Sequence, residues 1–129
     1  MKAVLDTHVV LWSQRDSQLL SRTAQTILAD LDTELLLSSV VPWELSVKER
    51  TGKLPQARPL LADFAQVRSN LGSVALPIAD EHALLAGSLD WPHKDPFDRM
   101  LAAQAILAGA ALVSADPTFD TLTGLARIW

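Results

Sequence analysis

Short apolar runs alternate with longer amphipathic stretches along the chain. The apolar runs predict buried strands at 2–6, 35–37 and 111–114, a further strand at 74–76 and a candidate last strand at 126–129. The amphipathic stretches predict a short helical turn at 8–13 and helices at 21–31, 42–50, 59–71, 80–89 and 95–109. Short strands that alternate with helices indicate an α/β fold with a largely parallel sheet.

The expected helix boundaries rest on a few residues with strong positional preferences. Ser21 suits the N-cap of its helix, and Pro42 and Pro59 suit the first turns of theirs. Gly52 fits the position just after a helix end. The helix that begins after Ser21 is expected to place Leu31 on its apolar face.

The composition is that of an ordinary globular protein. The 129-residue chain is 49% hydrophobic and has neither an internal repeat nor a linker rich in glycine or serine, so we expect a single domain over 1–129. The absence of cysteine excludes disulfides and thiolate metal sites. The longest apolar run, 105–115, is too short to span a membrane, and no signal-peptide pattern follows the N-terminus. These features favour a cytoplasmic protein outside the membrane.

The formal net charge of −4 is unusual for a protein that binds nucleic acid, because such proteins normally present a basic face. Four of the 15 acidic residues are the candidate site residues described next, and without them the acidic and basic residues are equal in number. A cation bound among these four would make the site tolerant of phosphate. Net charge therefore neither excludes nor supports a nucleic-acid partner.

Four acidic residues follow the ends of predicted strands or begin helices. They are Asp6, Glu44, Asp98 and Asp116. Ligands of open parallel sheets bind at the carboxyl ends of the strands, where Asp6 and Asp116 directly follow strands. Glu44 and Asp98 lie in the first turns of helices that start on the same rim. The four carboxylates are therefore expected to converge on one edge of the sheet.

Carboxylates crowded in this way raise one another's pKa values unless a cation lies among them. Mg²⁺ and Mn²⁺ prefer oxygen ligands, and Mg²⁺ keeps several of its own waters. A site of this kind can activate water and neutralise charge on a phosphodiester. The four acids therefore suggest a Mg²⁺ site, with Mn²⁺ as an alternative metal.

Structural roles compete with this interpretation for three of the acids. Asp98 lies three residues after Asp95, so the pair could cap a helix as N3 and N-cap. Glu44 and Lys48 have the spacing of a surface ion pair, and Asp116 precedes a proline, as in a turn. The acid at the end of the first strand is the hardest to dismiss, because burying it is costly unless it is paired or metal-bound.

Four segments resemble the motifs of the PIN-domain family, in particular the VapC-type toxins of bacterial toxin–antitoxin pairs. They are VLDTHVVLW at 4–12, SSVVPWELSVKERTGKL at 38–54, HKDPFDRMLAAQA at 93–105 and LVSADPTFD at 112–120. The motif acids of the family fall at Asp6, Glu44, Asp98 and Asp116. The resemblance implies a three-layer α/β/α sandwich with a mainly parallel central sheet. It also implies a Mg²⁺- or Mn²⁺-dependent endoribonuclease that inhibits translation by cleaving RNA. A cognate antitoxin would restrain it, as part of a homodimer or a hetero-oligomer.

Several further residues lie near the predicted site. Ser114 replaces the threonine of many relatives and keeps its hydroxyl, and Asp95 adds a fifth acid as either a metal ligand or a helix cap. Thr7 and Ser39 carry hydroxyls that either orient a ligand or cap an element. Arg99 is placed to contact a phosphate or to pair with Asp95.

The remaining aromatic and basic residues leave alternatives open. His93 either approaches substrate or is solvated in its loop, and Trp91 either stacks on a base or lies at an interface. Core packing is expected for Trp12, Trp43 and Trp129. A basic cluster either contacts RNA phosphates or an antitoxin, or is a solvated helix end; it consists of Lys48, Arg50, Lys53 and Arg58.

Two other functional classes compete with a nuclease. A catalytically silent PIN-fold scaffold would bind RNA or protein without cutting it, but the presence of all four acids argues against it. A haloacid-dehalogenase-type phosphatase would need a second aspartate two residues after Asp6, where the chain has His8. Zinc-protease, serine-hydrolase and nucleotide-loop motifs are absent from the sequence.

Overall fold

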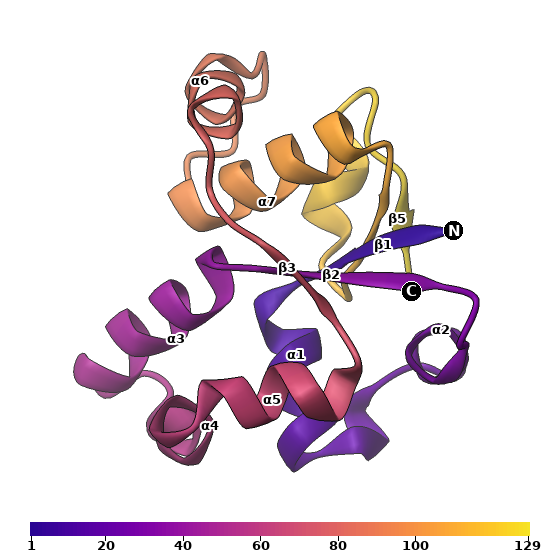
Figure 1. The fold of residues 1–129 in the computed structure, drawn as a ribbon. Helices are drawn as coiled ribbons and strands as arrows, with labels where there is room; N and C mark the ends of the chain where they lie inside the picture. The colour runs from indigo at the N-terminus through magenta and orange to yellow at the C-terminus, as the bar shows by residue number, and fades with distance from the viewer.

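The computed structural model describes residues 1–129 and contains one sheet of five strands. All neighbouring strands are parallel, in the order β3-β2-β1-β4-β5 (Figure 1). The strands are β1 (Lys2–Leu5), β2 (Glu34–Ser38), β3 (Val74–Leu76), β4 (Ala111–Val113) and β5 (Arg127–Ile128). The parallel sheet predicted from the sequence is confirmed, and β1 occupies its centre.

Helices cover both faces of the sheet, which confirms the predicted three-layer sandwich. Figure 1 shows α6 and α7 above the sheet and α1, α2, α4 and α5 below it. The helices are α1 (Thr7–Arg15), α2 (Arg22–Ala29), α3 (Val40–Arg50), α4 (Arg58–Ala62), α5 (Phe64–Leu71), α6 (Asp80–Ser88) and α7 (Pro96–Ala108). Three 3-10 helices complete the chain: η1 (Ser17–Leu19), η2 (Pro55–Ala57) and η3 (Pro117–Thr121).

The strands divide their side chains between two hydrophobic cores. In β1, Ala3 and Leu5 are buried in the core between the sheet and helices α1 and α2. Val4 is buried in the core between the sheet and α7. Residues alternate between the faces of a strand, so a continuous apolar run is what a strand covered on both faces requires. The central strand is therefore fixed from both sides, which also fixes the position of its carboxyl end.

Three predicted helix boundaries differ from the structure. α1 has nine residues, more than the short turn expected. The helix predicted at 59–71 is two helices, because Asp63 leaves the helical region (φ −149°, ψ 76°) and its carboxylate accepts a hydrogen bond from Gln66 N. Leu31 is fully exposed instead of facing the core, because Asp30 ends α2 and accepts hydrogen bonds in the turn that leads to β2.

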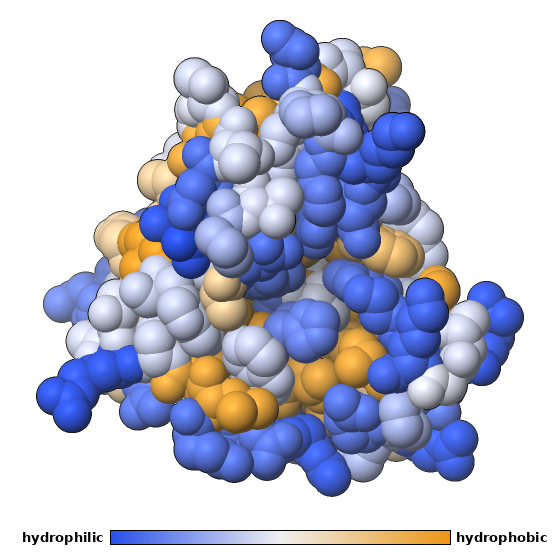
Figure 2. Space-filling model, turned by 180° about the vertical axis from the view of Figure 1, so that it is seen from behind, coloured by the Kyte–Doolittle hydropathy of each residue, from blue (hydrophilic) through white to orange (hydrophobic).

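Some large hydrophobic side chains remain on the surface. On the face seen in Figure 2, hydrophobic residues gather over the lower half, which holds α1, α2, α4 and α5, with hydrophilic residues around them. The exposed hydrophobic residues include Leu19, Leu31, Trp43, Ile78, Leu84 and Leu107. None of the helices has the length and apolar character needed to cross a bilayer.

Candidate active site

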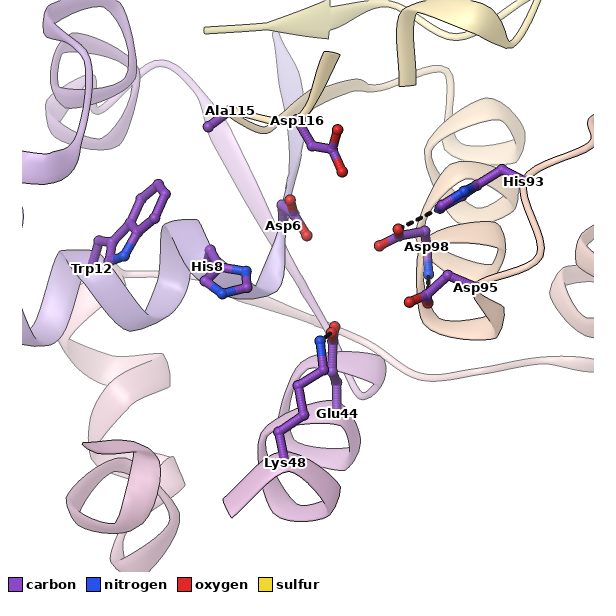
Figure 3. Close-up of a pocket in the computed structure, with 10 residues that line it drawn as sticks. All are labelled: Asp6, His8, Trp12, Glu44, Lys48, His93, Asp95, Asp98, Ala115 and Asp116. Carbon is purple, nitrogen blue, oxygen red and sulfur yellow. Dashed lines mark hydrogen bonds and ion pairs between the residues drawn. The ribbon is translucent and has the colours of Figure 1, made fainter. Parts of the chain in front are cut away.

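The carboxyl ends of the strands open into a pocket of about 480 Å³ that contains all four predicted acids and Asp95. Figure 3 shows these carboxylates directed toward a common space from β1, α3, α7 and the segment after β4. The pocket is lined by Asp6, His8, Trp12, Glu44, Lys48, His93, Asp95, Asp98, Ala115 and Asp116. The structure therefore brings together acids that are separated by up to 110 positions in the sequence.

Asp6 is at the centre of the pocket floor and is 7% exposed. It is the N-cap of α1, where its Oδ1 accepts a hydrogen bond from Thr7 N at 2.7 Å. Its Oδ2 accepts a second bond from the Ser114 hydroxyl at 2.6 Å. Burial raises the pKa of Asp6, and repulsion from Glu44 raises it further, although the two hydrogen bonds oppose this shift.

Glu44 lies on α3 and is only 3% exposed. Its Oε1 accepts a hydrogen bond from the Thr7 hydroxyl at 2.6 Å, and its Oε2 forms an ion pair with Lys48. Burial lowers the pKa of Lys48, but the Glu44 carboxylate outweighs this effect, so the pKa of Lys48 is raised overall. The predicted ion pair is confirmed, but it lies in the pocket and holds Glu44 in place there.

Asp95 and Asp98 have different roles at the start of α7. Asp95 is the N-cap, and its Oδ1 accepts hydrogen bonds from Phe97 N at 2.9 Å and Asp98 N at 3.0 Å, which confirms the predicted cap. Asp98 instead directs its Oδ2 to His93 Nε2 at 2.7 Å. Burial raises the pKa of Asp98 to about 6, with contributions from the neighbouring carboxylates, against the lowering effect of His93.

Asp116 is the N-cap of η3, so the predicted turn is present. Its Oδ1 accepts a hydrogen bond from Thr118 N at 2.9 Å. Burial raises the pKa of Asp116, but the hydrogen bonds from Thr118 outweigh it, and the nearby His93 and Arg127 add to a net lowering. Asp116 thus ionises more easily than an ordinary aspartate.

Hydroxyl groups connect the acids to one another. Ser114 donates to Asp6 and accepts a hydrogen bond from Asp116 N at 3.0 Å, as expected for a residue that orients ligands. Thr7 links Asp6 and Glu44 through its amide and its hydroxyl. Ser39 does not have the predicted capping role, because its backbone is already helical (φ −63°, ψ −16°) and its side chain makes no cap hydrogen bond.

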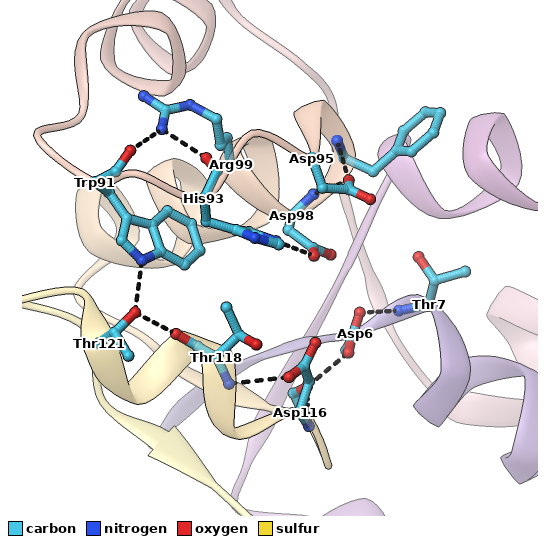
Figure 4. Close-up of polar contacts among 12 residues, drawn as sticks. Asp6, Thr7, Trp91, His93, Asp95, Asp98, Arg99, Asp116, Thr118 and Thr121 are labelled. Carbon is cyan, nitrogen blue, oxygen red and sulfur yellow. Dashed lines mark hydrogen bonds and ion pairs between the residues drawn. The ribbon is translucent and has the colours of Figure 1, made fainter.

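Arg99 points away from the pocket, which corrects the expectation that it contacts phosphate or pairs with Asp95. Its guanidinium donates to the carbonyl oxygens of Ala86, Leu89, Trp91 and His93 at 2.7–2.9 Å. Figure 4 shows the bonds to Trp91 and His93. Arg99 therefore closes the loop between α6 and α7 and fixes the residues around His93. Chain carbonyls occupy the donors that a phosphate would need.

A profile of the PIN domain matches residues 3–125. The chain belongs to the PIN domain family. It is also similar to Ribonuclease VapC22 of Mycobacterium tuberculosis (strain ATCC 25618 / H37Rv), with 28% identity over 113 residues that cover 88% of this chain and 85% of that protein. The family and this relative support the predicted enzyme class, a nuclease.

Solved structures share the PIN fold with this chain. A chain of FitAcB from Neisseria gonorrhoeae has a TM-score of 0.69 at 19% identity and covers 98% of this chain and 96% of its own. A chain of VapBC2 from Rickettsia felis, bound to a DNA fragment from its promoter, has a TM-score of 0.66 at 15% identity, with coverages of 99% and 98%. At these identities the likeness shows the fold.

The donor set of this PIN domain fits a hard divalent cation. The pocket supplies carboxylates and no thiolate, a set that suits Mg²⁺ or Mn²⁺. No three acidic or histidine side chains are gathered into a ready-made cage. Mg²⁺ retains most of its waters and needs only one or two protein carboxylates. An open group of acids, in which the pKa values of Asp6 and Asp98 are raised, suits such an ion.

The core packing predicted for Trp12 and Trp129 is confirmed, whereas Trp91 and Trp43 do not lie where the sequence predicted. Trp91 is 5% exposed and donates its indole N–H to the Thr121 hydroxyl at 2.8 Å, so it is a core residue and cannot stack on a base. Trp43 is 49% exposed and packs edge-on against Phe97. Trp12 is half-buried, and one edge lines the pocket.

Two pocket residues could have been found from the sequence. His8 and Trp12 follow Asp6 and are four residues apart, so they share one face of any helix that starts at the first acid. The predicted short turn at 8–13 is too short to indicate that the two residues share a helix face. No sequence signal marks the contact of His93 with Asp98, which depends on the Arg99 hydrogen bonds.

Proposed function

We propose that this PIN domain is a Mg²⁺- or Mn²⁺-dependent endoribonuclease and the toxin of a toxin–antitoxin pair. The observation that carries the proposal is the convergence of five carboxylates from four segments of the chain on one pocket at the carboxyl edge of the sheet. Acids that served only as caps or surface pairs would not need to share one space. Nor would two of them need raised pKa values.

Asp6, Glu44, Asp98 and Asp116 would hold the metal, with Asp95 nearby as the helix cap. A bound Mg²⁺ or Mn²⁺ supplies charge neutralisation at the scissile phosphate and lowers the pKa of a water. Asp6 is the best positioned of these acids, because Thr7 and Ser114 fix both of its oxygens. Thr7 and Ser114 therefore orient the acids without lining the pocket themselves.

His93 and Lys48 are the basic groups closest to the acids, and we assign them distinct roles. Lys48 forms an ion pair with Glu44 and brings one positive charge to the pocket. His93 hydrogen bonds to Asp98 and can hold a proton at Nε2 beside it. Both line the pocket around Asp6 (Figure 3), where they can meet a phosphodiester that binds there.

The biological role follows from the relatives. Ribonuclease VapC22 and the VapBC complexes connect this fold with toxin–antitoxin pairs, and two of the complexes were solved with DNA. We therefore assign RNA as the substrate, inhibition of translation as the consequence of cleavage, and an antitoxin as the partner, in a homodimer or a hetero-oligomer. DNA contact by the complexes is compatible with binding of DNA by the partner chain.

Metal-dependent cleavage of structured RNAs, including transfer RNAs, tests this function. We expect cutting with Mg²⁺ or Mn²⁺, none with EDTA, and a loss of about 100-fold or more in Asp6→Asn and Asp98→Asn, because each removes a metal-binding charge worth several kcal/mol. Asp32→Asn is the matched control, since Asp32 is exposed and its side chain makes no recorded contact.

Two results would contradict the proposal. Cutting that persists in EDTA would remove the metal from the mechanism, and full activity in both pocket variants would remove the acids. RNA binding without any cleavage, under all metal conditions, would favour the catalytically silent scaffold. Co-purification of the chain with the product of the adjacent upstream gene tests the partner separately.

A further inference from the structure

One wall of the pocket is aromatic. His8 and Trp12 both lie on α1 and line the pocket, with ring centroids 5.5 Å apart. Figure 3 shows this pair on the flank opposite His93 and Asp98, with Asp6 between the two flanks. Trp129 supports Trp12 from behind at 5.9 Å and does not line the pocket. The wall is therefore held in position by the last residue of the chain.

Core packing explains only part of the placement of Trp12. Trp12 does pack against the hydrophobic core on the α1 and α2 side of the sheet, but it is only half-buried and lies in a pocket with five carboxylates. Trp91, by contrast, is buried and donates its indole N–H to the Thr121 hydroxyl. The indole of Trp12 has no recorded hydrogen-bond partner and leaves an aromatic surface open to the pocket.

Charge gives a reason for an aromatic wall at this place. A pocket with five carboxylates and one lysine repels RNA phosphates on either side of the one that a metal neutralises. The whole chain is also acidic, with a net charge of −4. Stacking of a base on an aromatic ring does not depend on charge and is tolerant of base identity. An acidic nuclease therefore gains from stacking what it lacks in phosphate contacts.

We propose that His8 and Trp12 form a stacking wall for one unpaired nucleobase of the RNA, next to the phosphodiester that lies over Asp6. The inference rests on the proposed function, because it takes RNA as the substrate. A base inside a duplex is already stacked on its neighbours, so the wall favours single-stranded loops and ends. Base identity should matter less than the presence of a base.

Binding of a single-stranded RNA oligonucleotide by fluorescence anisotropy tests the wall without cleavage. The buffer holds Ca²⁺ to neutralise the acids, and a gel confirms that the RNA stays intact. We expect Trp12→Ala to weaken binding about 5- to 150-fold and Trp12→Phe to retain most of it. Trp43→Ala is the matched control, because Trp43 is an exposed tryptophan outside the pocket.

An abasic scan of the RNA separates stacking from a general effect on the fold. At one position of the RNA, removal of the base should weaken binding to the wild type as much as Trp12→Ala weakens binding of the intact RNA. Removal of the same base should not weaken binding to Trp12→Ala any further. Losses that add at every position would overturn the proposal. If Trp12→Ala unfolds at a much lower temperature than the wild type, His8→Ala gives the same comparison, because His8 is not among the buried core residues.

Cleavage with Mg²⁺, measured in parallel, keeps this inference distinct from the proposed function. A raised KM in Trp12→Ala with kcat little changed supports the wall. Metal-dependent cleavage with an unchanged KM overturns the wall and leaves the ribonuclease intact. RNA binding that depends on the base and on Trp12, without any cleavage, supports the wall and overturns the nuclease. A wild type that binds no RNA overturns both proposals.

Discussion

Two buried polar clusters lie near the carboxyl ends of the strands, and they differ in charge. In the acid pocket, burial raises the pKa values of Asp6 and Asp98, and repulsion from neighbouring carboxylates raises them further. In the second cluster, the Gln104 side chain accepts a hydrogen bond from the Ser38 hydroxyl, and its amide contacts Pro77 O and His82 Nδ1 at 3.2 Å. Every member of the second cluster can be neutral.

Both clusters satisfy their hydrogen-bonding groups, since no buried side-chain nitrogen or oxygen lacks a partner. Satisfied neutral networks strengthen a fold and specify its packing. Buried carboxylates of like charge cost free energy even when each is hydrogen bonded, because repulsion remains. The neutral cluster therefore holds α7 to β2 and supports the fold, whereas repulsion in the acid pocket lowers the stability of the fold.

Thr7→Val tests whether the acid pocket is built for cations and has the largest expected effect. The variant keeps the shape of Thr7 and removes its hydroxyl from Glu44. We expect about 10- to 100-fold weaker Mn²⁺ binding by calorimetry, because a group that orients a ligand is lost. Thr26→Val is the control, since Thr26 is exposed and bonds only to Arg22 O. Unchanged affinity would show that Glu44 needs no orientation by Thr7.

Gln104→Leu tests the neutral cluster. The change leaves the buried Ser38 hydroxyl and the Pro77 carbonyl without their partner. We expect a loss of about 2 kcal/mol in the free energy of unfolding by urea, with the cleavage rate per folded molecule unchanged. Gln18→Leu, on the exposed surface, should change little. A large loss of activity in stable Gln104→Leu protein would link the two clusters and break the distinction.

Asp98→Asn has the smallest expected effect on stability and the opposite sign. The folded-state pKa of Asp98 is raised from 3.8 to about 6, so its ionisation destabilises the metal-free fold. This penalty is absent below about pH 4, grows as the pH rises, and is complete above about pH 6. Metal-free Asp98→Asn should therefore be about 1 kcal/mol more stable than the wild type at neutral pH, part of the gain being offset by a weaker bond to His93.

Thermal unfolding in EDTA at acidic and neutral pH measures this difference, which should nearly vanish at the acidic pH. Saturating Mg²⁺ should reverse the order, because a cation that binds the wild type better stabilises it more. A metal-free variant that is less stable than the wild type at neutral pH would show that the Asp98–His93 hydrogen bond outweighs repulsion.

The sequence predicted the parts of the fold that depend on local pattern. Buried strands such as β1, β2 and β4 appear as uninterrupted apolar runs, and the acids after β1 and β4 followed from the same runs. The less buried β3 and β5 lie at or within the strands predicted at 74–76 and 126–129. The Asp95 cap was also predictable, because caps depend on residues only three apart. These features need no knowledge of what packs against them.

Features that depend on distant contacts were not predictable. Arg99 donates to four carbonyls of a loop whose path no local pattern determines. Trp91 is buried because its indole reaches Thr121, 30 residues later. The break at Asp63 interrupts a continuous amphipathic pattern, so periodicity alone merges α4 and α5. Charged and aromatic side chains in loops were therefore assigned to the wrong surfaces.

The central position of β1 has a consequence for the synthesis of the protein. Asp6 is among the first residues translated, yet its carboxylate accepts a hydrogen bond from the Ser114 hydroxyl, 108 positions later. Ser114 directly follows β4, which pairs with one edge of β1. Pairing of such distant segments comes late in folding. The growing chain therefore cannot assemble the pocket while most of it is still being made. A nuclease with the function proposed above would therefore be inert beside the message that encodes it until the segment with Ser114 has been made.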